Sequence, residues 1–184
     1  MCAIIDSNWR HPIERAEIAQ LCERQVLGSA ARLFGTSQAA LGKFDDYEGC
    51  ANLVYHYENQ GQPRILRLSY RPDRSLEMIQ AELHFIEYLA AGGMRVSRPV
   101  TSLHGHLVEV IPIARMNFIA VSFVKGRGMR VPDNGYRYRE GVPIQEYFQN
   151  WGQVLGQMHR LAKSYQPLSA SIKRPEWHQW EYYS

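Results

Sequence analysis

The sequence is poor in lysine and has no aspartate in its last quarter. Only four of its 184 residues are lysine, and the last aspartate is Asp133, which leaves the final 51 residues (134–184) without one. The lysines are Lys43, Lys125, Lys163 and Lys173. Chemistry that needs an aspartate carboxylate late in the chain is therefore excluded for these residues.

Cysteines, long apolar runs and a secretory leader are also scarce or missing. Cys2, Cys22 and Cys50 include no close pair of the kind found in metal knuckles or redox motifs, so we expect reduced thiols and no disulfide. No apolar run approaches the roughly 18 residues that a membrane span requires. The first nine residues lack the basic start and apolar stretch of a signal peptide. These absences predict a cytoplasmic protein with no membrane partner.

The overall composition fits a folded domain and does not choose a function. With 45% hydrophobic and 21% charged residues, the chain can bury roughly 70% of its unfolded surface in one domain or one and a half. The net charge of +3 arises from 21 basic and 18 acidic residues spread along the chain. A nucleic-acid module is the weakest interpretation, because no strand combines aromatic and basic residues, and we expect no nucleic-acid partner.

The spacing of apolar residues predicts an α+β fold that begins with a helix and a hairpin. Apolar residues recur at steps of three and four over 13–34, which predicts one helix, or two helices broken near Gly28, before Gly35. Alternating residues then predict strands over 53–58 and 64–68, joined by a turn.

The rest of the chain continues the mixed pattern. A helix is expected over 76–91, followed by strands over 107–113 and 118–124. The second of these strands is almost entirely apolar, which is typical of a central strand. A polar connector over 127–143 leads to a helix that begins at Ile144.

One acidic residue, Glu82, lies on the apolar face of the helix expected over 76–91. Glu82 points along the same side of its helix as Ile79 and Ile86, and a carboxylate in such a place needs a cation. Arg67, in the middle of the preceding strand, is the candidate. The alternative is that Glu82 reaches solvent and Arg67 faces the open side of the sheet.

Two backbone segments could recognise a ligand. Exposed N–H groups at Gly49, Cys50 and Ala51, just before Asn52, could cradle phosphate oxygens, although a plain hairpin turn explains the same residues. The end of the apolar strand, Ser122 to Val124, could present edge backbone groups to a flat heterocycle, although an ordinary strand end is the alternative.

Three further groups are interpreted as structural. His104 and His106 could bind a metal, but no third ligand is evident nearby, so a polar hairpin tip is preferred and no metal site is expected. His159 is interpreted as a packing or capping residue. The aromatic end could stack on a ligand or form a face for other protein elements; it comprises Trp177, Trp180, Tyr182 and Tyr183.

These features, in this order, resemble the N-terminal lobe of the aminoglycoside phosphotransferase-like kinases, a family that also contains choline and homoserine kinases. The resemblance covers about residues 44–165. Its motifs are a Gly-x-x-Asn-x-x-Tyr loop at Gly49, Asn52 and Tyr55, a strand at Ile65-Leu66-Arg67, a helix and turn at Glu82, Phe85, Ile86, Leu89, Gly93, Val96 and Pro99, a strand from Phe118 to Gly126, and Leu155-Gly156 before His159.

The resemblance implies a protein kinase-like small lobe that binds ATP. Arg67 would take the place of the usual lysine beside the phosphates and pair with Glu82. The loop over Gly49, Cys50, Ala51 and Asn52 would cover the phosphates, and the backbone of Ser122, Phe123 and Val124 would hold adenine. Arginine keeps the positive charge but is broader than an ammonium group, which is a departure from the family pattern.

A second departure concerns catalysis. The family's His-x-Asp catalytic loop and its Mg²⁺-binding aspartates follow the last helix seen here, and none of the seven histidines has an aspartate two positions later. We therefore expect no catalytic residue in this chain and Mg²⁺ ligands only in a missing C-terminal lobe. The implied organisation is a helical extension over 1–42, a nucleotide-binding lobe over 43–126, and a connector with the first helices of an incomplete lobe over 127–184.

Two functions remain open at this point. The first is the ATP-binding portion of a phosphotransferase that acts on a hydroxyl of a small substrate, inactive by itself because the chain is a truncated kinase. The second is a non-catalytic kinase-like binding domain. A dimer formed through the exposed C-terminal surface is a further expectation.

Overall fold

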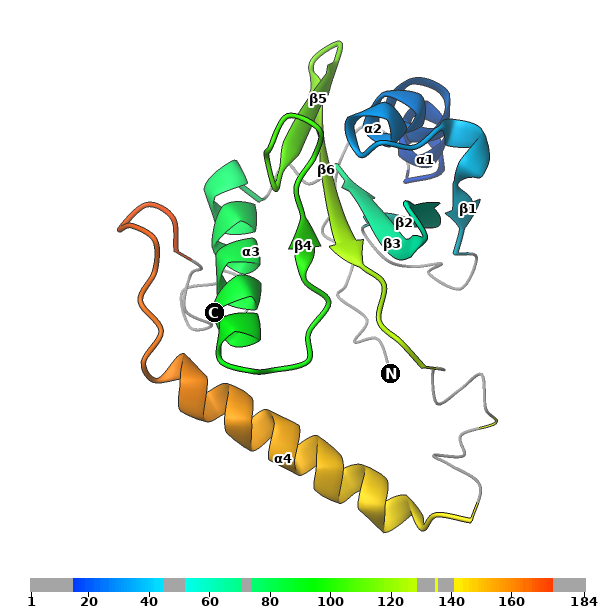
Figure 1. Ribbon diagram of the computed structural model, residues 1–184. Coiled ribbons are helices and arrows are strands. Elements are labelled where there is room, and N and C mark those ends of the chain that lie inside the picture. The colour runs from blue at the N-terminus through cyan, green and yellow to red at the C-terminus, as the bar shows by residue number, and fades with distance from the viewer. Residues whose placement is uncertain (1–14, 45–51, 71–73, 129–134, 136–140, 174–184) are drawn as a thin grey trace.

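The computed structural model describes residues 15–44, 52–70, 74–128, 135 and 141–173, and shows an antiparallel sheet with helices on both faces (Figure 1). Its elements in chain order are α1 Arg15–Leu21, the π-helical turn η1 Cys22–Val26, α2 Leu27–Leu33, the 3₁₀ turn η2 Gln38–Ala40, β1 Gly42–Lys43, β2 Asn52–Asn59, β3 Gln62–Ser69, α3 Leu76–Ala91, β4 Pro99–Val100, β5 Glu109–Ile113, β6 Met116–Val124 and α4 Ile144–Ala162. The α+β class expected from the sequence is confirmed.

The sheet is built around β6, as its apolar sequence predicts. The strand order is β1-β2-β3-β6-β4, and β5 also pairs with β6. All the pairings are antiparallel. The β2–β3 hairpin turns through Gln60 and Gly61, whose φ angles of 52° and 71° match the two-residue turn that suits the twist of antiparallel strands.

Alternate residues of the strands enter two separate cores. Leu66 and Leu68 of β3 pack toward the N-terminal helices, whereas Ile65 packs toward α3. The first core contains Cys22, Val26, Leu27, Ala30, Phe34, Tyr55, Tyr57, Leu66, Leu68, Ile111, Phe118 and Ala120. The second, smaller core consists of Ile79, Leu83, Ile119, Val121 and Phe123. The helices of residues 15–33 are therefore an integral layer on the sheet.

The N-terminal helix departs from the sequence prediction in one respect. The interruption is the π-helical turn Cys22–Val26, and Gly28 lies inside α2, so the alternative of a break near Gly28 is wrong. Cys22, Val26 and Ala30 are spaced by four, and this spacing drifts by about 40° per step on an ordinary α-helix. The wider π turn compensates for that drift and keeps all three residues buried.

Helix α3 has the bounds that the sequence predicts. The hydroxyl of Ser75 caps its first turn by accepting a hydrogen bond from the Met78 N–H at 3.3 Å. Gly93, with φ +83°, allows the chain to leave the helix. Ile79 and Leu83 then lie on the sheet, so the orientation of the whole helix is fixed.

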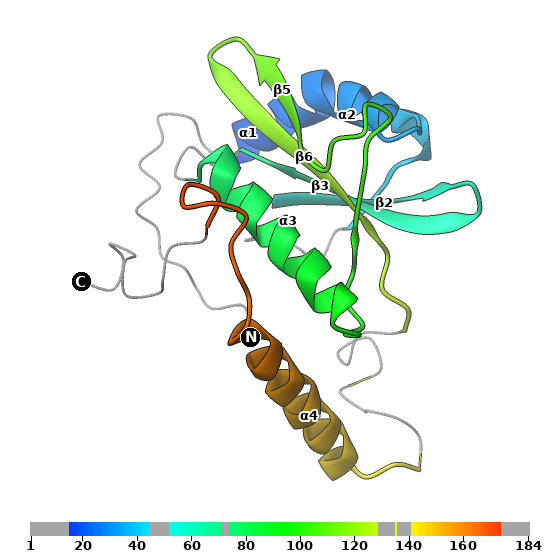
Figure 2. The same cartoon turned by 60° about the vertical axis from the view of Figure 1, so that its left-hand side comes forward.

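Helix α4 extends away from the sheet and is held at its C-terminal end (Figure 2). Tyr165 packs edge-on against Phe85 and Tyr88 and shares a 2.9 Å hydrogen bond with Nδ1 of His84. The Tyr88 hydroxyl donates to the Leu161 carbonyl at 3.0 Å. Several apolar side chains of α4 are exposed, namely Ile144, Phe148, Trp151 and Val154. His159, which was expected to pack or cap, is also exposed.

Within the described ranges, no helix is both long and apolar enough to cross a membrane. The aromatic residues 177–183 and the loop residues Gly49, Cys50 and Ala51 lie outside the described part of the chain.

The Cys22 thiol should be unreactive while the protein is folded. Burial raises its pKa to about 12, with a smaller contribution from the Glu23 carboxylate, so almost no thiolate forms at pH 8. Peptide mapping after iodoacetamide treatment should find Cys22 unmodified in buffer and modified in denaturant. Equal labelling in both conditions would contradict the buried position.

Replacing Tyr165 should loosen α4 from α3. The Tyr165→Ala substitution removes the ring contacts and the hydroxyl bond, and we expect it to lower the free energy of unfolding by about 1–2 kcal/mol. Hydrogen exchange of the last turns of α4 should accelerate. Tyr165→Phe keeps the ring contacts and serves as the control; an equally large effect of both variants would assign the anchor to the hydroxyl alone.

Candidate functional site

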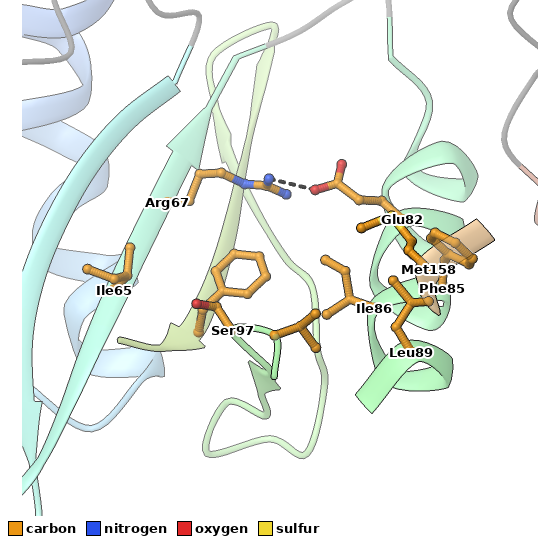
Figure 3. Close-up of a pocket in the computed structure, with 10 residues that line it drawn as sticks. Ile65, Arg67, Glu82, Phe85, Ile86, Leu89, Ser97 and Met158 are labelled. Carbon is orange, nitrogen blue, oxygen red and sulfur yellow. Dashed lines mark hydrogen bonds and ion pairs between the residues drawn. The ribbon is translucent and has the colours of Figure 1, made fainter. Parts of the chain in front are cut away.

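A cavity of about 580 Å³ lies between the sheet, α3 and α4, and its lining residues come from all three layers (Figure 3). The lining residues are Ile65, Arg67, Glu82, Phe85, Ile86, Leu89, Val96, Ser97, Phe123 and Met158. Most of this wall is apolar, with one ion pair at one end. Such a combination suits a ligand that has a flat apolar part and an anionic part.

Arg67 and Glu82 meet at the polar end of this cavity. The Nη1 atom of Arg67 donates to Oε1 of Glu82 at 2.7 Å, and the two side chains are 20% and 18% exposed. The pairing predicted from the sequence is therefore present, and the alternative, in which the two side chains point to different surfaces, is wrong. Arg67 is positioned by the pairing of β3 with β2 and β6, which fixes its backbone on both sides.

The Arg67 guanidinium keeps donor capacity for a ligand. Its Nε atom is buried and has no hydrogen-bond partner among the described residues. The group also lies over the ring of Phe123, with Cζ 5.1 Å from the ring centroid. A buried donor without an acceptor is unfavourable, and an anion that reached this Nε atom, which is closed to solvent in this structure, would be stabilised there.

A second arginine, which sequence reasoning missed, faces the same carboxylate. The Nη1 atom of Arg74 lies 3.7 Å from Oε2 of Glu82. Two guanidinium groups therefore face the one carboxylate of Glu82. Arg74 belongs to the loop before α3, and no spacing rule connects a loop residue to a helix residue two turns later.

The four lysines do not replace Arg67 at the site. Lys43 pairs with Glu23 at 2.6 Å, and Lys125 lies over the ring of Phe44 at 5.6 Å. Neither Lys43 nor Lys125 lines the cavity, and Lys163 and Lys173 lie at and beyond the end of α4. Arg67 is therefore the one cationic side chain among the described residues that line the cavity.

Asn52, the one described member of the predicted phosphate loop, begins β2. It pairs with Ser69 in the register that also pairs Val54 with Arg67. Side chains two residues apart on a strand share a face, so Asn52 projects from the same face of the sheet as Arg67. The residues that precede it lie outside the described part of the chain.

The predicted adenine segment is divided between the two faces of the sheet. Phe123 lines the cavity, but the Ser122 side chain is fully buried on the other face, where its hydroxyl lies 2.7 Å from that of Tyr57. The backbone of Ser122 and Phe123 pairs with β3 and β4, and the Val124 N–H donates to the Arg98 carbonyl at 2.9 Å. The structure therefore differs from the expected open edge, because the backbone of this segment is already hydrogen-bonded to its neighbours.

Two further contributions to the cavity were not predicted from the sequence: those of the segment before β4 and of helix α4. Val96 and Ser97 come from the segment before β4, and Met158 comes from α4. Met158 lies on the apolar stripe of its helix, which is a visible signal, but the stripe alone does not reveal the neighbour that it faces.

Comparisons with known proteins agree with this geometry. Residues 47–182 match the phosphotransferase enzyme family. The amicoumacin kinase of Bacillus subtilis (strain 168) is 31% identical over 156 residues, which make up 84% of this chain and 44% of that protein. The structure of the amicoumacin kinase hAmiN in complex with AMP-PNP, Ca²⁺ and Ami has a TM-score of 0.76 at 30% identity, and covers 91% of this chain and 48% of that one.

A more distant structure supports the fold alone. The microcompartment-associated aminopropanol kinase has a TM-score of 0.62 at 21% identity, with 86% of this chain and 45% of that chain covered. The chain thus spans less than half the length of these relatives. Because the family match covers most of the sequence and the kinase-like arrangement of sheet and helix is present, the chain belongs to the phosphotransferase enzyme family.

Proposed function

We propose that this chain forms the ATP-binding portion of a small-molecule phosphotransferase that transfers the γ-phosphate of ATP to a hydroxyl group. The observation that carries the proposal is the Arg67–Glu82 pair at the end of an apolar cavity, with the Arg67 Nε donor unpartnered. The hAmiN structure, which contains the ATP analogue AMP-PNP, supports it.

In this proposal, each end of the cavity serves one part of the nucleotide. Arg67 donates to phosphate oxygens through Nε, while Glu82 holds the guanidinium in place through Nη1. Arg74 lies next to them, with its Nη1 atom 3.7 Å from Oε2 of Glu82. The apolar wall that includes Ile65, Leu89 and Phe123 takes the adenine ring.

The described cavity residues do not form an Mg²⁺ site. Glu82 is the one carboxylate that lines the cavity, and it already faces two arginines. Mg²⁺ requires oxygen ligands that are free to bind it, so its ligands have to come from elsewhere.

These 184 residues lack the family's catalytic loop. With no His-x-Asp sequence and no aspartate after Asp133, they supply no base for the substrate hydroxyl, so we propose that this chain alone transfers no phosphate. A second candidate is a kinase-like domain that binds a partner without catalysis. The proposed partners are ATP and a small hydroxyl-bearing molecule, in a cytoplasmic setting, together with a second copy of the chain on the exposed apolar side of α4.

Binding of Mg·ATP should depend on Arg67. We expect millimolar Mg·ATP to raise the melting temperature of the 184-residue chain, and Arg67→Ala to weaken binding at least about tenfold in calorimetry, a loss of about 1.4 kcal/mol. Arg67→Lys should retain most of the affinity because it keeps the charge. Arg115→Ala, at an exposed turn between β5 and β6, removes the same charge and should leave binding unchanged.

Glu82→Gln separates positioning from charge in the same assay. The amide keeps the shape but weakens its hold on Arg67, so we expect intermediate affinity. If wild-type protein shows no response to millimolar Mg·ATP, the non-catalytic candidate replaces the phosphotransferase. Wild-type affinity in Arg67→Ala would place the nucleotide at another site.

A further inference from the structure

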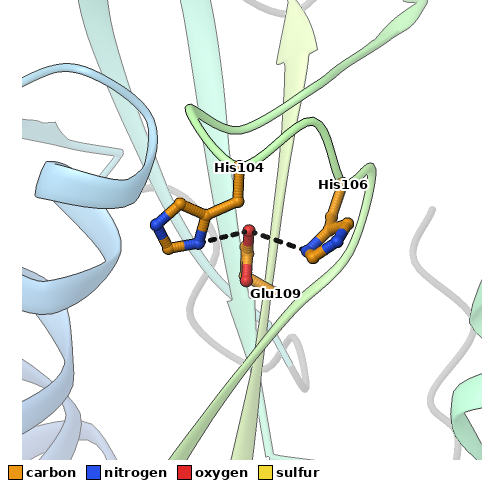
Figure 4. A group of neighbouring side chains, drawn as sticks. All are labelled: His104, His106 and Glu109. Carbon is orange, nitrogen blue, oxygen red and sulfur yellow. Dashed lines mark ion pairs between the residues drawn. The ribbon is translucent and has the colours of Figure 1, made fainter.

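The loop between β4 and β5 gathers two histidines and a glutamate (Figure 4). The Nδ1 atoms of His104 and His106 lie 3.6 Å and 3.4 Å from Oε1 of Glu109. No metal was expected here because the sequence shows no third ligand close to the two histidines, and the structure corrects that point by placing Glu109 beside them. Gly105, with φ +82°, turns the loop so that both imidazoles stand over the first residue of β5.

The separations between these atoms suit ligands of one ion better than direct hydrogen bonds. A charge-assisted hydrogen bond between imidazole and carboxylate has a length of about 2.7–2.9 Å, which is shorter than both distances. Two atoms bound to a tetrahedral zinc ion at about 2.0–2.2 Å lie roughly 3.3–3.6 Å apart. The three ligand atoms all lie within 4.8 Å of one another, so a small movement of exposed side chains completes the site.

The carboxylate is held in place before any metal binds. The Ser102 hydroxyl donates to Oε1 of Glu109 at 2.5 Å and accepts the backbone N–H groups of His104 and His106 at 3.1 Å and 3.3 Å. The Leu103 N–H donates to the Leu33 carbonyl at the end of α2, at 2.8 Å. Outer contacts of this kind orient metal ligands, and here one serine organises the loop and the carboxylate together.

The three residues differ in exposure: the carboxylate is buried, whereas the two imidazoles are open to solvent. The side chain of Glu109 is 11% exposed, whereas those of His104 and His106 are 62% and 66% exposed. The buried carboxylate is therefore a ligand with a fixed position, and the exposed imidazoles can move to bind an ion that arrives from solvent. Solvent access also leaves the remaining coordination position open to water.

This group is separate from the nucleotide cavity. Glu109 lies two residues before Ile111 on β5, and Ile111 belongs to the core shared with the N-terminal helices. Arg67 projects from the opposite face of the sheet, and neither histidine nor Glu109 lines its cavity.

We propose that His104, His106 and Glu109 bind one divalent transition-metal ion, zinc in the first instance, and that the ion fastens the β4–β5 loop to the sheet. Two imidazoles and one carboxylate favour zinc over Mg²⁺ and Ca²⁺, which prefer sites made of oxygen atoms alone. The proposal does not depend on the chain being a kinase.

Zinc titration of the whole chain tests this site. With ZnCl₂ in equilibrium dialysis, we expect one ion per chain and a rise in melting temperature, with no such response to MgCl₂ at the same concentrations. His104→Ala and His106→Ala should each weaken zinc binding at least about tenfold, consistent with the loss of one of three ligands. The double variant should lose the bound ion and the temperature shift. His159→Ala, which removes an exposed imidazole on α4, is the matched control and should behave as wild type.

Folding is checked in the same samples with EDTA present. Because both imidazoles are exposed, the double variant should then melt close to the wild-type temperature. Failure of wild-type protein to bind micromolar zinc would overturn the proposal, and so would wild-type zinc affinity in the double variant. A large loss of stability of the double variant in EDTA would assign the histidines to metal-free support of Glu109, which also overturns it.

Discussion

The ion pair between Arg67 and Glu82 joins the central sheet to α3 at the border between their apolar contacts and the cavity. Each residue alone would leave a charge in a partly dry environment, which is strongly unfavourable, so each position depends on the other. Elsewhere the contact between sheet and helix is apolar, through residues such as Ile79, Leu83 and Val121. The pair therefore fixes a guanidinium group within an otherwise apolar layer, and gives the cavity its polar end.

Arginine in this position changes how an anion can be held. An ammonium group would face Glu82 and a phosphate as a point charge, whereas the planar guanidinium uses Nη1 for Glu82 and keeps Nε for another acceptor. Packing over Phe123 fixes the plane of the group, and Arg74 shares the carboxylate. The chain thus has the family match and the kinase-like fold, and beside Glu82 it has a planar guanidinium group where the resemblance implies an ammonium group.

Local signals predicted the parts of the fold that local interactions decide. The bounds of α3 follow from its serine cap and the glycines after it, and the Arg67–Glu82 pair follows from strand and helix periodicity applied to neighbouring elements. The π turn at 22–26 was not predictable, because it corrects a mismatch between helix spacing and the sheet below. Arg74 and Glu109 were missed for a related reason: loop conformation, not spacing, brings each to its partner.

The most direct test of the central claim follows the Arg67 Nε–H resonance in ¹H–¹⁵N spectra while Mg·ATP is added to the 184-residue chain. We expect a selective and saturable downfield shift of this resonance, because a phosphate oxygen becomes the acceptor that the buried donor lacks. An unchanged Arg67 resonance in a protein that binds Mg·ATP would contradict the account.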